Sequence, residues 1–306
     1  MVDQATTKTA ADTVVSVSDS GMGVHLLRMA SAIGLLRESP VAIIGSALIA
    51  FWVLMAVFAS LVTPYNPNAQ DFAMLADPTP AWYPWEAHWL GTDHLGRDIW
   101  ARLVWGARTV LTIAPIAVFS AYVFGCLMGM LAGYLGGWVD VLVSFISDII
   151  LSFPVLILYI ILITAFGPSA LNIIFAVTFV SAPGIGRIVR GLVLDLRNHE
   201  YVDAAKIRGE SPIYIMVVEL LPNARGPLIV DACLRMGYTI ITIGILGFLG
   251  LGLPPPDPDW GGMVKDARVV ATVFPHMAIF PCLAISSLVL GLNLLADGLR
   301  DISLRD

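Results

Sequence analysis

The chain has 306 residues, of which 58% are hydrophobic and only 13% charged, and this apolar excess excludes an ordinary soluble domain of the same size. Its formal net charge of −6 is spread over connecting segments without a basic stripe, so nucleic acid is not an expected partner. The composition predicts an all-α membrane protein that lies in a lipid bilayer.

The first 62 residues predict a tail, a short helix and one membrane span. Residues 1–24 are polar and lack the basic start of a secretory signal, so we expect a flexible cytoplasmic tail. Residues 25–62 are expected to hold an interfacial helix and then the first transmembrane span, because residues 41–62 carry no charge over a length that crosses a bilayer.

Residues 63–108 form a polar, proline-rich region that is expected to be an extracytoplasmic loop. This region contains four candidate metal ligands: His88, Asp93, His94 and Asp98. No predicted helix or hairpin brings them together, and Asp98 can form a structural ion pair with Arg97 beside it. The three cysteines also lack metal-ligand spacing and are expected to pack in apolar stretches: Cys126, Cys233 and Cys282. We therefore predict no metal site.

Residues 109–139 carry no charge and predict the second span. Three glycines recur within it at four-residue spacing, which is typical of a face on which another helix approaches closely: Gly125, Gly129 and Gly133. Gly136 and Gly137 are expected to turn the chain.

The next uncharged stretch, residues 149–186, is too long for one span, and Gly167-Pro168-Ser169 divides it into the third and fourth. Pro154 is expected to kink the third span, and Pro183 the end of the fourth. Asp148 precedes this stretch. We expect it near the aqueous edge, although at membrane depth it would be a functional residue by default.

Residues 187–225 are the longest polar interruption in the second half of the chain and are expected to contain two helices. The first follows Asn198 as a possible N-cap and ends at Gly209. The second begins at Ser211-Pro212, the order of an N-cap and a first helical residue.

Helical spacing on the first of these helices predicts a face of small residues flanked by charge, which suits docking onto another protein. The residues expected on or beside this face are Tyr201, Asp203, Ala204, Ala205 and Arg208. An ordinary amphipathic helix at the membrane surface is the alternative interpretation of the same spacing.

Two further spans are expected at residues 236–256 and 269–296, separated by a rigid proline-rich loop. Six spans place both termini on the same side. Residues 187–225 contain six Arg or Lys, against three in residues 63–108 and two in 253–276, so this loop and both termini are predicted to be cytoplasmic.

Three segments resemble permease subunits of ATP-binding-cassette (ABC) importers. Residues 201–209 resemble the EAA loop, whose coupling helix sits in a groove of the ATP-hydrolysing subunit, although Asp203 stands where the family has Glu and Glu219 where it often has His. Residues 90–98, Leu-Gly-Thr-Asp-His-Leu-Gly-Arg-Asp, resemble the LGTDxxGRD segment of one of the two permeases of dipeptide, oligopeptide and nickel importers. The glycine-rich 247–252 segment, with Trp260-Gly261 and residues 294–301, resembles its C-terminal signature.

This resemblance implies the second permease of such an importer in a bacterial cytoplasmic (inner) membrane. Residues 109–306 would form a type I permease core with a cytoplasmic coupling helix. The partners implied are a homologous permease, two ATP-binding subunits and an extracytoplasmic substrate-binding protein. The ATPase-coupling residues implied are Tyr201, Asp203, Ala204, Ala205, Arg208 and Gly209.

The sequence contains no Gly-x-x-x-x-Gly-Lys loop, so we expect a non-enzymatic chain without cofactors whose partner subunits bind ATP and Mg. An ion-coupled secondary transporter is the alternative function, but it should show inverted repeats and ionisable residues near the midplane. An intramembrane enzyme would need a reactive constellation within the spans. The substrate stays open among dipeptides, oligopeptides, opines, nickel chelates and sugars.

Overall fold

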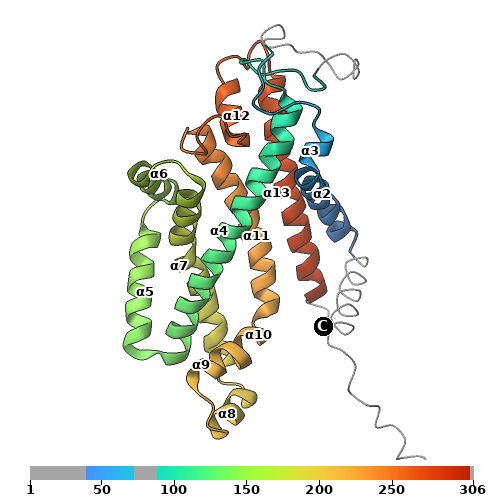
Figure 1. The fold of residues 1–306 in the computed structure, drawn as a ribbon. Helices are drawn as coiled ribbons and strands as arrows, with labels where there is room; N and C mark the ends of the chain where they lie inside the picture. Colours follow the sequence, from blue (N-terminus) through green and yellow to red (C-terminus); the bar gives the residue numbers. More distant parts are fainter. Residues whose placement is uncertain (1–38, 72–87, 304–306) are drawn as a thin grey trace, which may run out of the picture.

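The structure is a computed structural model that describes residues 39–71 and 88–303, and within them it is a bundle of long helices with no β-strand (Figure 1). The predicted tail and interfacial helix, residues 1–37, lie outside the described residues. The helices are α2 (Pro40–Val57), α3 (Ala59–Val62), α4 (Ile99–Leu135), α5 (Gly137–Ser152), α6 (Val155–Phe166), α7 (Ala170–Leu196), α8 (Glu200–Ile207), α9 (Pro212–Tyr214), the π-helix η2 (Ile215–Leu220), α10 (Leu221–Asn223), α11 (Arg225–Phe248), α12 (Trp260–Ala267) and α13 (His276–Ser303).

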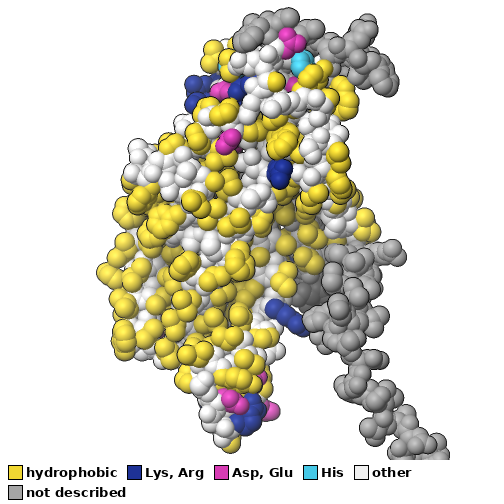
Figure 2. Space-filling model, in the orientation of Figure 1, with side chains coloured by type: hydrophobic (Ala, Val, Ile, Leu, Met, Phe, Trp, Pro, Cys, Tyr) yellow, Lys and Arg dark blue, Asp and Glu magenta, His cyan; other side chains and the backbone are white. Residues whose placement is uncertain are grey.

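Within the described part of the chain, five helices are long and apolar enough to cross a membrane: α2, α4, α7, α11 and α13. The bent pair α5–α6 makes up to six, which confirms the predicted all-α membrane fold. Hydrophobic side chains cover most of the middle of the face shown in Figure 2, and charged side chains gather mainly towards its two ends. The start of α2 and the end of α13 lie towards the end of the molecule that carries α8 (Figure 1).

Several predicted boundaries were wrong because charge was taken to end a span. The helix that contains the second span begins at Ile99, ten residues before the predicted start of the span, and Asp98 caps it by accepting a hydrogen bond from the Ala101 amide at 2.6 Å. The fifth span, α11, is Arg225–Phe248 rather than residues 236–256. Helix α7 runs through Pro183 to Leu196, so only residues 197–224 connect the two long helices.

Pro154 breaks the third span rather than kinking it, since α5 and α6 meet at 89°. Asp148, which the sequence left without a partner, accepts a hydrogen bond from Arg187 Nη2 on α7 at 2.7 Å. Asp140 likewise binds Arg190, whose Nη2 donates to Oδ2 at 2.6 Å. Two ion pairs therefore link α5 to α7, and the depth of Asp148 in the membrane stays a prediction.

The three-glycine face of α4 packs against α7, as the spacing predicted. A β-carbon on Gly125 would lie 2.6 Å from the Ile185 side chain, and one on Gly129 would lie 2.5 Å from the Gly186 carbonyl oxygen. One on Gly133 would lie 2.9 Å from the Val193 side chain. The helices approach so closely that no side chain fits between them at these positions.

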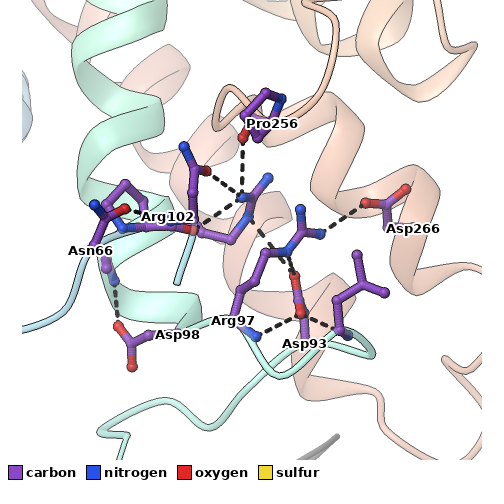
Figure 3. A network of polar contacts seen from close by, with 11 residues as sticks. Asn66, Asp93, Arg97, Asp98, Arg102, Pro256 and Asp266 are labelled. Carbon is purple, nitrogen blue, oxygen red and sulfur yellow. Dashed lines mark hydrogen bonds and ion pairs between the residues drawn. The ribbon is translucent and has the colours of Figure 1, made fainter. Parts of the chain in front are cut away.

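The 90–98 segment forms a compact polar turn at the end of the molecule opposite α8 (Figures 1 and 3). Asp93 Oδ1 accepts the Leu95 and Arg97 amides, each at 2.9 Å, and its Oδ2 accepts Arg97 Nε at 2.7 Å. Arg97 also reaches Asp266 at 3.4 Å, so its expected pairing with Asp98 was wrong. Asp98 instead binds His88 at 2.7 Å.

Arg102 extends this network from α4 to the loop before α12. Its Nη1 donates to the carbonyl oxygens of Pro67 at 3.2 Å and Pro256 at 3.4 Å (Figure 3). Nearby, the fully buried Trp260 donates its indole N–H to the Leu103 carbonyl at 2.9 Å. The family-like residues of these segments thus join the loops at this end of the molecule to α4.

Asp259 lies in the middle of the glycine-rich signature. Its carboxylate caps α12 by accepting the Gly261 and Gly262 amides at 3.2 and 3.1 Å, and a β-carbon on Gly247 would lie 2.2 Å from its Oδ2. The side chain is 4% exposed, and burial raises the pKa of this carboxyl from 3.8 to about 6. The glycines therefore allow the chain to close around an acid that burial favours in its neutral form.

This shift predicts a pH-dependent stability. Because the folded pKa of Asp259 exceeds the unfolded value, its contribution is fully present below pH 3.8 and is lost as pH rises through about 6. The shift between these two pKa values corresponds to a difference of about 3 kcal/mol in unfolding free energy between the low-pH and high-pH limits. Asp259→Asn removes the titration and keeps a capping side chain. Compared with this variant, we expect the thermal midpoint of the wild type in detergent to rise as pH falls from 7 to 4; parallel curves would contradict the assignment.

Candidate functional site

Helix α8 projects beyond the long helices at the end of the molecule opposite α12 (Figure 1). Its N-cap is His199 rather than the predicted Asn198, whose side-chain amide instead donates to the Leu194 carbonyl at 3.4 Å. Its C-terminus follows the prediction: Gly209 has φ +79°, and the Glu210 amide binds the Ala205 carbonyl at 3.2 Å. This hydrogen-bond pattern is a Schellman motif, which fixes the direction in which the chain leaves α8.

The predicted docking face needs a correction. Ala205 is 0% exposed and, with Val202, packs inside a cluster that includes Ile215 and Leu220 of the following helix. It therefore cannot contact another protein. Asp203 and Ala204 are exposed, as a docking face requires.

The most prominent residue of the exposed face is one that the sequence-based prediction did not include. Ile207 is 87% exposed, and Ala204 precedes it by three residues on the same face of α8. Ile213, just beyond the turn, is also an exposed large hydrophobic side chain. An isoleucine at the polar end of a helix was the available signal, because an exposed apolar group there is unfavourable without a partner.

Arg208 and Tyr201, which were predicted to face a partner, also contact their own chain, and Arg208 remains exposed. Arg208 Nη2 donates to Glu219 Oε1 at 2.9 Å, so the glutamate that departs from the family pattern fixes α8 to η2. Tyr201 is half-buried, and burial together with the nearby Glu219 raises the pKa of its hydroxyl. Ser211 caps the second helix, as predicted, by accepting a hydrogen bond from the Tyr214 amide at 3.2 Å. The π-helical segment that follows was not predicted.

Substitution of Gly209 should act through the backbone conformation rather than through a steric clash, because nothing lies within 4 Å of a β-carbon built there. A β-branched residue at this φ costs about 1–2 kcal/mol. In Gly209→Val we therefore expect amide hydrogen exchange in α8 to accelerate about 5- to 30-fold. Gly209→Asn is the control, since Asn tolerates left-handed backbone, and should exchange close to the wild-type rate. Equal exchange in the valine variant would show that this cap does not hold α8.

A cavity of about 340 Å³ opens between α4, α5, α6, α7 and α11, about half-way along the bundle. The lining residues on α4 and most of those on α7 are apolar, and five residues with hydroxyl side chains also line the cavity: Tyr159, Ser181, Tyr238, Thr239 and Thr242. Among the described residues that line this cavity, Arg235 on α11 is the one that is charged.

Arg235 belongs to a polar triad that links α11 to α4. Its Nε donates to Asp231 Oδ2 at 2.7 Å, and the same oxygen accepts a hydrogen bond from the Tyr122 hydroxyl. These residues were not predicted, because the fifth span was placed too far along the chain. The i, i+4 spacing of opposite charges was the available signal, since such a pair can lie inside a membrane helix.

Within residues 39–71 and 88–303, no three His, Cys, Asp or Glu side chains lie close enough together to hold a metal ion. The four candidate ligands of the 63–108 loop do not converge on one point. His88 and Asp98 bind each other, Asp93 binds Arg97, and His94 is exposed. The contacts of His88, Asp93 and Asp98 therefore hold the loop together.

Comparison with known proteins gives two matches to protein families. Residues 125–306 match the family "Binding-protein-dependent transport system inner membrane component". Residues 29–78 match the "N-terminal TM domain of oligopeptide transport permease C".

Individual relatives cover most of the chain. It is 40% identical to the dipeptide transport system permease protein DppC of Alkalihalophilus pseudofirmus over 87% of this chain and 86% of the relative. It is 37% identical to the glutathione transport system permease protein GsiD of Pectobacterium atrosepticum over 85% of both chains. DppC of Haemophilus influenzae is 36% identical over 87% of this chain and 90% of its own length.

Proposed function

This chain belongs to the family of binding-protein-dependent transport system inner membrane components and is a permease subunit of an ABC importer; from this premise we propose that it imports small peptides and is driven through α8. The observation that carries the proposal is the exposed face of α8 formed by Ala204 and Ile207. A small residue beside an exposed apolar one suits insertion into a groove of an ATP-hydrolysing subunit.

Movement of α8 can reach the membrane because α8 is fixed to its own chain at several points. Val202 and Ala205 pack against η2, and Arg208 binds Glu219. After η2, α10 leads directly into α11, which lines the cavity. Closure of the ATPase subunits would therefore displace α8 and η2 together, reorient α11 and alternate access to the cavity.

The proposed assembly contains a homologous second permease, two ATP-binding subunits and an extracytoplasmic binding protein. ATP and Mg are bound by the ATP-binding subunits, and the present chain has no catalytic role. The α8 end faces the cytoplasm, as the excess of basic residues in 187–225 favours, and both termini are cytoplasmic. The outer loops that contain the Arg97 and Arg102 networks would meet the binding protein.

The proposed substrate class rests on the relatives, whose names specify dipeptides and glutathione. Both are small peptides with free carboxylates. A peptide of this size is therefore the first candidate for the present importer, ahead of opines, nickel chelates and sugars.

Site-specific crosslinking tests the coupling proposal. In a cysteine-free importer purified from native membranes, Ile207→Cys should crosslink to an ATP-binding subunit. Val269→Cys is the matched control, because Val269 is 80% exposed but follows α12 at the other end of the chain's long helices. Crosslinking of neither variant, or purification of a lone chain that transports on an ion gradient, would overturn the proposal.

The orientation predicts opposite labelling of two single cysteines. Asn198→Cys lies beside α8 and Asp257→Cys lies in the loop before α12, at the two ends of the molecule (Figure 1). In intact cells, an impermeant maleimide should label the cysteine at position 257 and not the one at position 198. Labelling of both from outside would contradict this topology.

A further inference from the structure

Arg235 lies close to the middle of a membrane-spanning helix. It follows Arg225, the first residue of α11, by ten positions, which at 1.5 Å per residue is about 15 Å along a helix of about 36 Å. Its side chain is 23% exposed. An ionisable group at this depth is unfavourable unless it is paired or faces a polar cavity, and such groups commonly mark a substrate pathway.

The pairing with Asp231 uses only one edge of the Arg235 guanidinium. Asp231 accepts one hydrogen bond from Arg235 Nε–H and a second from the Tyr122 hydroxyl. The other edge lies over Gly184, where a β-carbon would lie 3.6 Å from Nη1 and 3.7 Å from Nη2. Gly184 and Arg235 both line the cavity, and within the described residues the polar contacts of the Arg235 side chain are with Asp231, through Nε, and with the Tyr122 hydroxyl. The Nη1–Nη2 edge of Arg235 therefore lies in the cavity wall beside Gly184, where no side chain covers it from this position of α7.

We propose that Arg235 is a binding site for a carboxylate of the transported solute inside the membrane cavity; this rests on the proposed function. The planar Nη1–Nη2 edge matches the two oxygens of a carboxylate. The hydroxyls of Ser181 and Thr242 and those of the cavity tyrosines lie within the same wall and suit peptide amide groups. A cavity of about 340 Å³ accommodates a solute of dipeptide size.

Asp231 has a defined part in this site. In the empty cavity it balances the charge of Arg235 and holds the guanidinium through Nε. It also lowers the net positive potential that an arriving carboxylate meets, so the solute is held weakly and can leave again. A transport pathway needs such a site, because tight binding would stop passage.

The charge of the cavity can be measured without knowing the natural substrate. In the complete importer with a cysteine-free background, Ser181→Cys places a thiol in the cavity wall. We expect it to react faster with anionic 2-sulfonatoethyl methanethiosulfonate than with its cationic trimethylammonium analogue, after normalisation to a free thiol. Arg235→Gln should lower this anion-to-cation rate ratio at least about tenfold, whereas Arg235→Lys should keep it above one and Asp231→Asn should raise it.

Protection of the same thiol tests the carboxylate itself. Millimolar dialanine should slow the modification of Ser181→Cys, and dialanine amide should not; Arg235→Gln should remove the difference. Three outcomes would each overturn the site: equal protection by both compounds, an anion-to-cation rate ratio that is unchanged in Arg235→Gln, or a thiol that neither reagent modifies. Loss of the α8 crosslink to the ATP-binding subunit would overturn the coupling proposal instead, so the two failures are distinguishable.

Discussion

Gly129→Ile is expected to prevent the chain from folding into a stable permease. A β-carbon at this position would already lie 2.5 Å from the Gly186 carbonyl oxygen and 2.6 Å from the Val189 β-carbon. Both belong to α7, and the first is backbone, which cannot rotate away. Isoleucine adds three further carbon atoms, so its unfavourable effect exceeds the about 1–3 kcal/mol typical of an overpacked core.

The measurement is the yield of monodisperse protein after detergent extraction and size exclusion. Gly191→Ile is the matched control, because Gly191 lies on α7 and a β-carbon there meets nothing within 4 Å. We expect near-normal yield for the control and little or none for Gly129→Ile. A normal yield of Gly129→Ile would mean that α4 and α7 do not pack through this face.

The α4–α7 contact could be predicted from the sequence because glycines at four-residue spacing leave a shallow stripe along a membrane helix, into which a second helix packs closely. The turns at Gly136 and Gly209 were predictable for a related reason. Each has a positive φ, +65° and +79°, where glycine is strongly preferred. Such turns depend on the local backbone conformation, so they can be predicted from the sequence without knowing which element packs against them.

The boundary of α11 could not be predicted in the same way. Asp231 and Arg235 lie within the span because they bind each other and Tyr122, a residue more than a hundred positions earlier on α4. From the sequence alone, two charged residues indicate a loop rather than a membrane span, and only the tertiary contact shows otherwise. The cavity around Arg235 was missed for the same reason, since its wall comes from five helices.

The face of α8 was misassigned because Ala204 and Ala205 are alike in size and adjacent in sequence. Which of them is buried depends on where η2 lies, and η2 is a π-helical segment that the apolar spacing did not indicate. The charged side chains were equally ambiguous. Arg208 and Asp203 are both exposed, yet each also binds within its own chain, Arg208 to Glu219 and Asp203 to Lys206, both at 2.9 Å.

Ala205→Trp and Ala204→Trp are expected to abolish substrate-stimulated ATP hydrolysis for two different reasons. Ala205 is fully buried against Ile215 and Leu220, so an indole there must displace α8 from η2. Ala204 is exposed, so an indole there leaves the packing of this chain unchanged but enlarges the surface that would enter the ATPase groove. Both variants should lose stimulated hydrolysis and uptake almost completely.

A protease assay on the isolated permease, without its ATPases, separates the two mechanisms. Cleavage near Lys206 should accelerate in Ala205→Trp, because α8 has left its packing site, and should stay at the wild-type rate in Ala204→Trp. Co-purification of the ATP-binding subunits should fall in both. Lys206→Ala, on the exposed surface of α8, removes the Asp203 contact without adding volume and should retain the ATPases. If Ala204→Trp holds its ATPases and transports normally, the exposed face of α8 is not the surface through which hydrolysis drives import.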